Sequence, residues 1–242
     1  KIDAETGEKI EGVVFEVYDA ATDEKVAEIT SSSQPQEVNI FRRGKTYKII
    51  EKEAPVGYYN AKPVEITIDE NTPANLPVNL TIPEDKIDLV VKKVDSDGHP
   101  LANVKLEVVD KESGETIQSW QTKPDEEHQI GKKLFAGKTY IIRETEPIDG
   151  YYYTTEREVT VDQFKPNEPV TITMIDGAIN YKIAKVDEKG QYVEGVKLEL
   201  TDITDKENPV AVELPNNGIT TKEPFELKKV LKAEHTYQLV EK

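Results

Sequence analysis

The chain has 242 residues, of which 32% are charged, and its formal net charge is −16 at pH 7. This charge argues against nucleic acid and anionic membrane surfaces as partners, because both would repel the chain. The absence of cysteine excludes disulfides and thiolate metal sites, and no apolar run is long enough to be inserted in a bilayer. Since the sequence starts at Lys1 without an initiator methionine or a signal peptide, we expect a part of a longer polypeptide.

The sequence contains three copies of one repeated unit. One block has a period of 93 − 1 = 92 residues and occurs as KIDAETGEKIEGVVFEV (1–17), KVDSDGHPLANVKLEV (93–108) and KVDEKGQYVEGVKLEL (185–200). A second block occurs as GKTYKIIEKEAPVGYY (44–59), GKTYIIRETEPIDGYY (137–152) and HTYQLVEK (235–242). Self-similarity at a fixed period is typical of tandem modules.

These matches predict module one over residues 1–84, module two over 85–177 and module three over 178–242. Only module two is complete, because module one lacks most of its first strand and module three lacks its last strands. No Gly/Ser-rich tether separates the modules, so we expect stiff connections between neighbours.

The strand pattern is clearest in module two. Short runs rich in Val, Ile, Thr and Tyr alternate with turn residues, and these runs are DLVVKKV, VKLEVVD, ETIQSW, TYIIRET, REVTV and PVTITMI. About six or seven short strands with such punctuation indicate an all-β sandwich or barrel. The Asp-x-x-Gly sequences at 95–98 and 187–190 are expected to be tight turns.

Residues of one parity along a strand share a face of the sheet. In chain order, the core-facing sets are Tyr47, Ile49, Glu51; Val78, Leu80, Ile82, Glu84; Ile87, Leu89, Val91, Lys93; Tyr140, Ile142, Glu144; Val170, Ile172, Met174, Asp176; Ile179, Tyr181, Ile183, Lys185; and Tyr237, Leu239, Glu241. In module two, three apolar faces therefore each end in an ionisable side chain.

A buried unpaired charge costs several kcal/mol, and one lysine does not balance two carboxylates. The cluster is balanced if apolar surroundings keep Glu144 protonated. Desolvation also makes proton transfer from Lys93 to a carboxylate accessible, leaving a neutral amine beside a neutral acid. Such an amine, held in contact with the acid, can attack the carbonyl carbon and form an amide with loss of water.

The ordered motifs resemble a known family. Lys-Val-Asp-x-x-Gly, then Gly-Lys-Thr-Tyr-x-x-x-Glu with Pro-x-x-Gly-Tyr, then a last strand ending Met-Ile-Asp resemble the CnaB-type (SpaA-like, prealbumin-like) repeats of Gram-positive surface adhesins and pilins. The resemblance covers essentially the whole chain. It implies tandem Ig-like or prealbumin-like β-sandwich modules, end to end, with spontaneous isopeptide bonds between a first-strand lysine and a last-strand Asn or Asp.

Carried over to this sequence, the resemblance makes Lys93 the nucleophile, Asp176 the acceptor and Glu144 the proton shuttle. Glu51 and Glu241 occupy the position of Glu144 in the other modules. Module one offers Lys1 and Glu84, but Glu84 is one methylene longer than the family's acceptor and follows Pro83, so we expect an ion pair there. Lys185 has its acceptor outside the chain.

The resulting prediction is a non-enzymatic stalk of a cell-surface adhesin or fimbrial protein. It is expected outside the cell, anchored to the cell wall through another region, with neighbouring modules as its partners and a host or matrix protein bound through other domains. One alternative is that the modules themselves bind a host or matrix ligand. Another is an enzyme on this fold, but no His, Cys or Ser constellation recurs.

No cofactor or metal is expected. Asp95-Ser-Asp97-Gly98 superficially resembles a calcium loop, but its glycine falls at the fourth position rather than the sixth. The three histidines, His99, His128 and His235, show no ligand spacing and are expected at the surface. Trp120 is expected to pack in the core rather than to offer a ligand platform.

Overall fold

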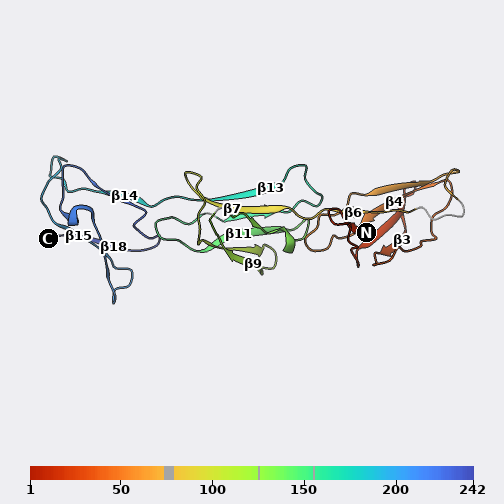
Figure 1. Ribbon diagram of the computed structural model, residues 1–242, viewed down its shortest axis with the longest axis horizontal. Coiled ribbons are helices and arrows are strands. Elements are labelled where there is room, and N and C mark those ends of the chain that lie inside the picture. The colour runs from red at the N-terminus through yellow and green to blue at the C-terminus, as the bar shows by residue number, and fades with distance from the viewer. Residues whose placement is uncertain (74–78, 125, 155) are drawn as a thin grey trace.

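The computed structural model describes residues 1–73, 79–124, 126–154 and 156–242. Its strands form three successive groups, which lie in a row along the long axis of the molecule (Figure 1). Within the described residues, every sheet belongs to a single group. The predicted fold class, tandem all-β modules arranged end to end, is confirmed.

The first group contains a four-stranded antiparallel sheet of order β3-β2-β4-β5 and a parallel pair, β1-β6. Its strands are β1 (Ile2–Asp3), β2 (Val14–Asp19), β3 (Glu24–Thr30), β4 (Lys45–Glu51), β5 (Val64–Ile68) and β6 (Pro83–Glu84). Val78, which the sequence placed on the last core-facing set of module one, lies outside the described residues.

The second group pairs a four-stranded sheet, β12-β11-β8-β9, with a three-stranded sheet, β10-β7-β13. Its elements are β7 (Leu89–Asp95), β8 (Lys105–Asp110), β9 (Thr116–Gln121), β10 (His128–Gln129), the 3₁₀ turn η1 (Gly131–Lys133), β11 (Thr139–Glu146), β12 (Arg157–Thr160) and β13 (Val170–Asp176). All six strands expected from sequence are present.

The third group contains the sheets β16-β15-β18 and β14-β17. Its elements are β14 (Asn180–Ile183), β15 (Leu198–Asp202), β16 (Val210–Val212), the 3₁₀ turn η2 (Pro215–Gly218), β17 (Phe225–Lys228) and β18 (Tyr237–Glu241). Within the described residues, β14 pairs with one strand only, whereas β7 lies between two strands.

Each group has its own hydrophobic core. In the second group, β7 and β13 face β8 and β11, and their inward residues are buried: Leu89, Val91, Ile172, Met174, Leu106, Val108, Tyr140 and Ile142. These are alternate residues of each strand, as expected for two sheets that bury one face each. The predicted inward sets in this group are therefore the observed ones.

The first and last strands of the second group are neighbours and run parallel. β13 pairs with β7 over its whole length, from Val170 opposite Leu89 to Asp176 opposite Asp95. In the first group, β6 pairs with β1 in the same way, and Glu84 lies opposite Asp3. The lysine lies on the first strand, two residues before the residue that pairs with the final acidic residue. Lys93 precedes Asp95 in this way, and Lys1 precedes Asp3.

A glycine–tyrosine turn joins the first group to the second. The Gly57 N–H donates to the carbonyl of Leu134 (2.8 Å), and the Gly57 carbonyl accepts from the Ile87 N–H (2.8 Å). Tyr59, the second tyrosine after Gly57, is only 3% exposed and belongs to the core of the second group. The turn therefore fixes the two groups through both backbone bonds and core packing.

The second junction repeats this arrangement. The Gly150 N–H donates to the carbonyl of Leu231 (3.1 Å), and the Gly150 carbonyl accepts from the Ile179 N–H (2.8 Å). Tyr152, which corresponds to Tyr59, is 46% exposed here. The backbone hydrogen bonds of the glycine are therefore the same at both junctions, whereas the tyrosine is buried only at the first.

Two features of the second group differ from the sequence expectation. β10 and η1 were not predicted, because a strand of two residues is too short to show a period of two. His128 in β10 is half-buried rather than fully exposed, because it stacks on the half-buried ring of Trp120, with 4.3 Å between ring centroids. Trp120 itself packs against the core, as expected.

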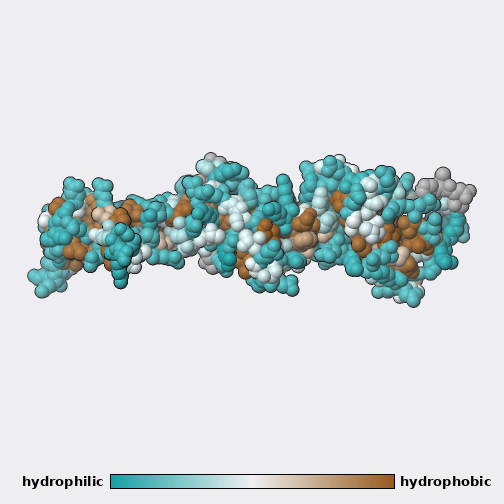
Figure 2. All heavy atoms as spheres, turned by 90° about the horizontal axis from the view of Figure 1, so that it is seen from below, coloured by the Kyte–Doolittle hydropathy of each residue, from teal (hydrophilic) through white to brown (hydrophobic). Residues whose placement is uncertain are grey.

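The face of the molecule shown in Figure 2 is mostly hydrophilic, with hydrophobic residues gathered in separate patches. This surface matches the high fraction of charged residues. Among the residues that the structure describes, none of the helices is long and apolar enough to span a membrane.

Replacing Gly150 with alanine should loosen the second junction. Gly150 has φ +87°, and an added Cβ would lie 2.7 Å from the carbonyl oxygen of Lys229, so the turn must move away from its partners. Gly137 is the matched control, since it has φ +77° and open space around an added Cβ. A left-handed alanine costs about 1–2 kcal/mol at either site.

Small-angle X-ray scattering of the full chain measures the effect. We expect Gly150→Ala to broaden the distance distribution relative to the parent, and Gly137→Ala to leave it unchanged. Equal distributions for the two variants would show that the turn does not hold the groups in line.

Candidate functional site

The structure brings Lys93, Glu144 and Asp176 together in the second group. Lys93 is the fifth residue of β7, Glu144 lies on β11, and Asp176 ends β13. The Lys93 Nζ lies 2.6 Å from Glu144 Oε1 and is also in contact with Asp176 Oδ1. All three side chains are 1% exposed. The three predicted residues thus form one buried cluster, and the parity of each strand is what aims them inward.

Thr154 is a fourth member that the sequence did not reveal. Its hydroxyl contacts both the Lys93 Nζ and Asp176 Oδ1, and its backbone N–H donates to Glu144 Oε2 (3.3 Å). The residue follows three tyrosines in a segment between β11 and β12, where no strand period indicates which side chains face inward. Only the folded chain shows that this segment passes over the cluster.

Burial governs the protonation of the cluster. Desolvation raises the pKa of Glu144 above its ordinary value, and the Lys93 ammonium opposes that rise. The negative charge of Asp176 adds to the rise. A proton on Glu144 leaves one ammonium and one carboxylate, so the buried charges balance. The arrangement holds an amine, a carboxyl acceptor and a second carboxyl that can carry a proton between them.

The first group contains a corresponding cluster. The Lys1 Nζ lies 3.4 Å from Glu51 Oε2 and 3.3 Å from Glu84 Oε2, and the three side chains are 0% exposed. The Ala61 N–H donates to Glu51 Oε2 (2.7 Å), as the Thr154 N–H does to Glu144. Burial and the neighbouring Glu51 carboxyl raise the pKa of Glu84 to about 8. The predicted ion pair between Lys1 and Glu84 is therefore placed in a fully enclosed site.

The corresponding pair of the third group is open to solvent. The Lys185 Nζ lies 2.8 Å from Glu241 Oε2, but the side chains are 38% and 51% exposed. No strand of the described residues covers this pair in the way that β13 covers Lys93. The same residue types thus form an ordinary surface ion pair here.

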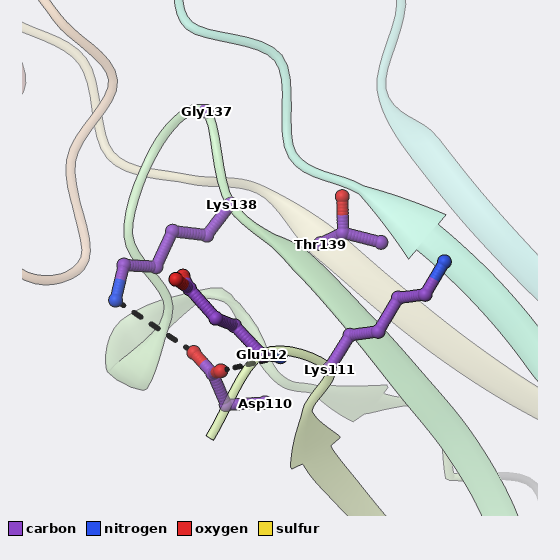
Figure 3. Close-up of a pocket in the computed structure, with 6 residues that line it drawn as sticks. All are labelled: Asp110, Lys111, Glu112, Gly137, Lys138 and Thr139. Atoms are coloured by element: carbon purple, nitrogen blue, oxygen red, sulfur yellow. Dashed lines mark hydrogen bonds and ion pairs between the residues drawn. The ribbon is translucent and has the colours of Figure 1, made fainter. Parts of the chain in front are cut away.

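A hollow of about 410 Å³ on the second group is lined by Asp110, Lys111, Glu112, Gly137, Lys138 and Thr139 (Figure 3). Asp110 accepts the backbone N–H groups of Glu112 and Ser113 and lies 3.7 Å from the Lys138 Nζ. Equivalent pairs, Lys45 with Asp19 and His235 with Asp202, occur in the other groups. This recurrence indicates a structural lock on a turn rather than a ligand site.

Asp95, Asp97 and His99 have ligand atoms within 4.8 Å of one another. However, Asp95 Oδ1 already accepts the backbone N–H groups of Asp97 and His99, at 3.0 and 2.9 Å. These bonds account for the cluster as a tight turn that ends β7, so the geometry does not call for a metal ion.

Replacing Lys93 with methionine should destabilise the second group by at least about 3 kcal/mol, because the two carboxyl groups lose their only buried counter-charge. Lys92→Met is the matched control on the same strand, since Lys92 pairs with Glu127 at the surface and should matter far less. Urea unfolding of the full chain, followed by the fluorescence of the single tryptophan Trp120, measures both. Similar midpoints for the two variants would contradict a buried role for Lys93.

Comparisons with solved structures find low sequence identity. The chain is 20% identical to the Bacillus anthracis TIE protein, over 98% of this chain and 43% of that one, with a TM-score of 0.40. It is 15% identical to the C-terminal fragment of the pilus adhesin SpaC from Lactobacillus rhamnosus GG (74% and 95% covered, TM-score 0.37). It is 18% identical to a streptococcal ancillary pilin (88% and 68% covered, TM-score 0.37).

The chain thus spans less than half the length of the TIE protein. No curated protein matches it significantly. The family model described as the SpaA prealbumin-like fold domain matches twice, over residues 1–80 and 87–177. These two matches cover most of the first two strand groups, including Lys1, Lys93, Glu144 and Asp176 but not Glu84, so the chain belongs to the SpaA prealbumin-like fold domain family.

Proposed function

We propose that this chain is a structural stalk region of a bacterial cell-surface adhesin or fimbrial protein, in which a spontaneous amide bond joins Lys93 to Asp176. We take its modules to be residues 1–84, 85–177 and 178–242. The single observation that carries the proposal is the buried contact between Lys93 and Asp176 across two neighbouring parallel strands.

The bond would form in one turnover. Lys93 passes a proton to the carboxyl cluster, and the neutral Nζ attacks Cγ of Asp176. The Nζ–Cγ bond forms, the Cγ–O bond breaks, and Glu144 carries the proton from nitrogen to the departing oxygen, which leaves as water. Contact between the groups in a dry site contributes the proximity that an unassisted amide condensation lacks. The Thr154 hydroxyl is placed to hold the amine against the acceptor.

The position of the bond suits a mechanical role. The chain enters the second group through β7 and leaves it through β13. A bond from Lys93 to Asp176 would let a pulling force pass from one strand to the other through covalent atoms. Residues 94–175 would then lie outside the load path. The Lys93 and Asp176 side chains are consumed when they react with each other, so the chain would not be an enzyme with an external substrate.

The setting of the protein follows from the same proposal. Family membership and the CnaB-type motifs support a location outside the cell, on a Gram-positive bacterium, with anchoring to the cell wall through a region outside this chain. Its immediate partners would be neighbouring modules of the same polypeptide, and host or matrix proteins would be bound by other domains. A hydrophilic surface and a joint repeated at both junctions support the stalk role.

Mass spectrometry of the denatured full chain tests the bond. We expect a digest to contain a branched peptide that joins the segments of Lys93 and Asp176 and weighs one water less than their sum. Asp176→Ala should remove the branched peptide, and Glu144→Gln should greatly slow its formation. Separate linear peptides from the unaltered chain would refute the bond.

Single-molecule pulling of the full chain tests the mechanical role. The second group should give no unfolding extension in the unaltered chain, because residues 94–175 are shielded from force. In Asp176→Ala, an extension for the length of this group should appear. An extension in the unaltered chain would contradict the load path.

A further inference from the structure

The clusters of the first and second groups share one backbone frame. β1 and β6 are parallel with Asp3 opposite Glu84, just as β7 and β13 are parallel with Asp95 opposite Asp176. The backbone therefore presents Glu84 to Lys1 in the register that presents Asp176 to Lys93. One difference between the two clusters is the length of the acceptor side chain, which is one methylene longer in Glu84 than in Asp176.

A second difference compensates for that length. The segment that crosses the cluster of the second group places the Thr154 hydroxyl between Lys93 and Asp176. The corresponding residue of the first group is Ala61, which has no hydroxyl but makes the equivalent backbone bond to Glu51. The smaller side chain at position 61 leaves more space in the cluster, and the longer acceptor side chain at position 84 takes up more space. The Lys1 Nζ can then reach the Glu84 carboxyl at 3.3 Å without an intervening group.

As an ion cluster, this site is poorly satisfied. Neither carboxyl oxygen of Glu84 accepts a hydrogen bond from the described residues, and Glu51 Oε1 also lacks a donor. Three enclosed oxygens without donors are costly when the groups are charged. An amide would remove one ammonium and one carboxyl group from the site and leave Glu51 as the only ionisable side chain of the three.

We propose that Lys1 and Glu84 form a second intramolecular amide bond, with glutamate as the acceptor. The inference rests on the chemistry proposed for Lys93 and Asp176. Lys1 gives a proton to Glu51, and its Nζ attacks Cδ of Glu84. The Nζ–Cδ bond forms, the Cδ–O bond breaks, and Glu51 returns that proton to the departing hydroxyl, which leaves as water. Glu51 then takes the second proton of the attacking nitrogen, so the site ends as a neutral amide beside a neutral Glu51.

The state of Glu84 suits this step. Its pKa of about 8 keeps the carboxyl protonated at neutral pH, and a neutral acid is a better acyl acceptor than a carboxylate. Glu51 is held by the Ala61 N–H on the other side of the amine, where it can take the proton. A bond here would place residues 2–83 outside the load path, so two consecutive groups would carry force through covalent links.

The intact mass of the denatured full chain gives the first test. We expect the unaltered chain to weigh two waters less than calculated, and both Asp176→Ala and Glu84→Ala to weigh one water less. A digest should contain a branched peptide that joins Lys1 Nζ to Glu84. Lys1→Arg should abolish this branch, which also rules out the terminal α-amino group as the nucleophile.

Glu84→Gln is a variant of equal size with a distinct signature. Its acceptor would release ammonia, so the first group should lose one ammonia in place of one water. Glu84→Asp combined with Ala61→Thr copies the second group and should restore the loss of one water. In every Glu84 variant, the Lys93–Asp176 branch reports that the second group has folded.

The outcomes separate the two proposals. A deficit of one water, mapped to Lys93 and Asp176 with Lys1 and Glu84 in linear peptides, would overturn this inference and leave the proposed function intact. No deficit at all would overturn both.

Discussion

The parallel pairing of the first and last strands is the constraint on which the rest of this structure depends. It places the entry and the exit of the second group side by side, and it puts Lys93 within reach of Asp176 although 83 positions separate them. Parallel neighbours cannot be joined by a hairpin, so the intervening chain must fold into the rest of the group. That fold supplies both the opposite sheet, which carries Glu144, and the segment that lays Thr154 over the cluster. One pairing thus creates the core, the contact between Lys93 and Asp176, and the load path that we propose.

Burial decides what the lysine and its carboxyl partners can do. The three groups contain the same pairing of a first-strand lysine with a glutamate of the Gly-Lys-Thr-Tyr strand or its equivalent, yet the side chains are fully enclosed in two groups and open in the third. Where they are enclosed, desolvation raises the pKa of Glu144 and of Glu84, and a neutral acid beside an amine becomes accessible. Lys185 and Glu241 are stabilised by water instead, and they remain a weak ion pair. Residue identity alone would have made the three sites equivalent.

In the second group, the sequence was sufficient wherever a strand was long enough to show alternation. In the third group the same pattern was wrong for Tyr181 and Leu239, which are 51% and 45% exposed, because no last strand of the described residues covers that face. Ile87, Leu89 and Val91 predict the inward direction of Lys93, and Ile172 and Met174 predict that of Asp176; the observed registers agree. Short or irregular segments gave no such signal. Thr154 lies between strands, so no alternation in the sequence predicts its contact with Lys93. β10 has only two residues, so no alternation predicts the stacking of His128 on Trp120. The enclosure of Glu84 also required the fold. Its extra methylene and the preceding Pro83 favoured an ion pair with Lys1 over a crosslink, and the sequence did not show that both side chains are fully enclosed.

The junctions explain why covalent bonds inside the groups would be useful. The links between groups are non-covalent: backbone hydrogen bonds at Gly57 and Gly150, the buried ring of Tyr59 at the first junction, and ion pairs of Lys229 and Lys232 at the second. These joints resist bending, because each turn is bonded to two separate segments of the following group. They do not carry tension on their own, because the chain itself runs continuously through each junction, from β6 into β7 and from β13 into β14. Tension would therefore act on the folded groups rather than on the joints, and the proposed bond between the first and last strands would keep a group from being pulled open.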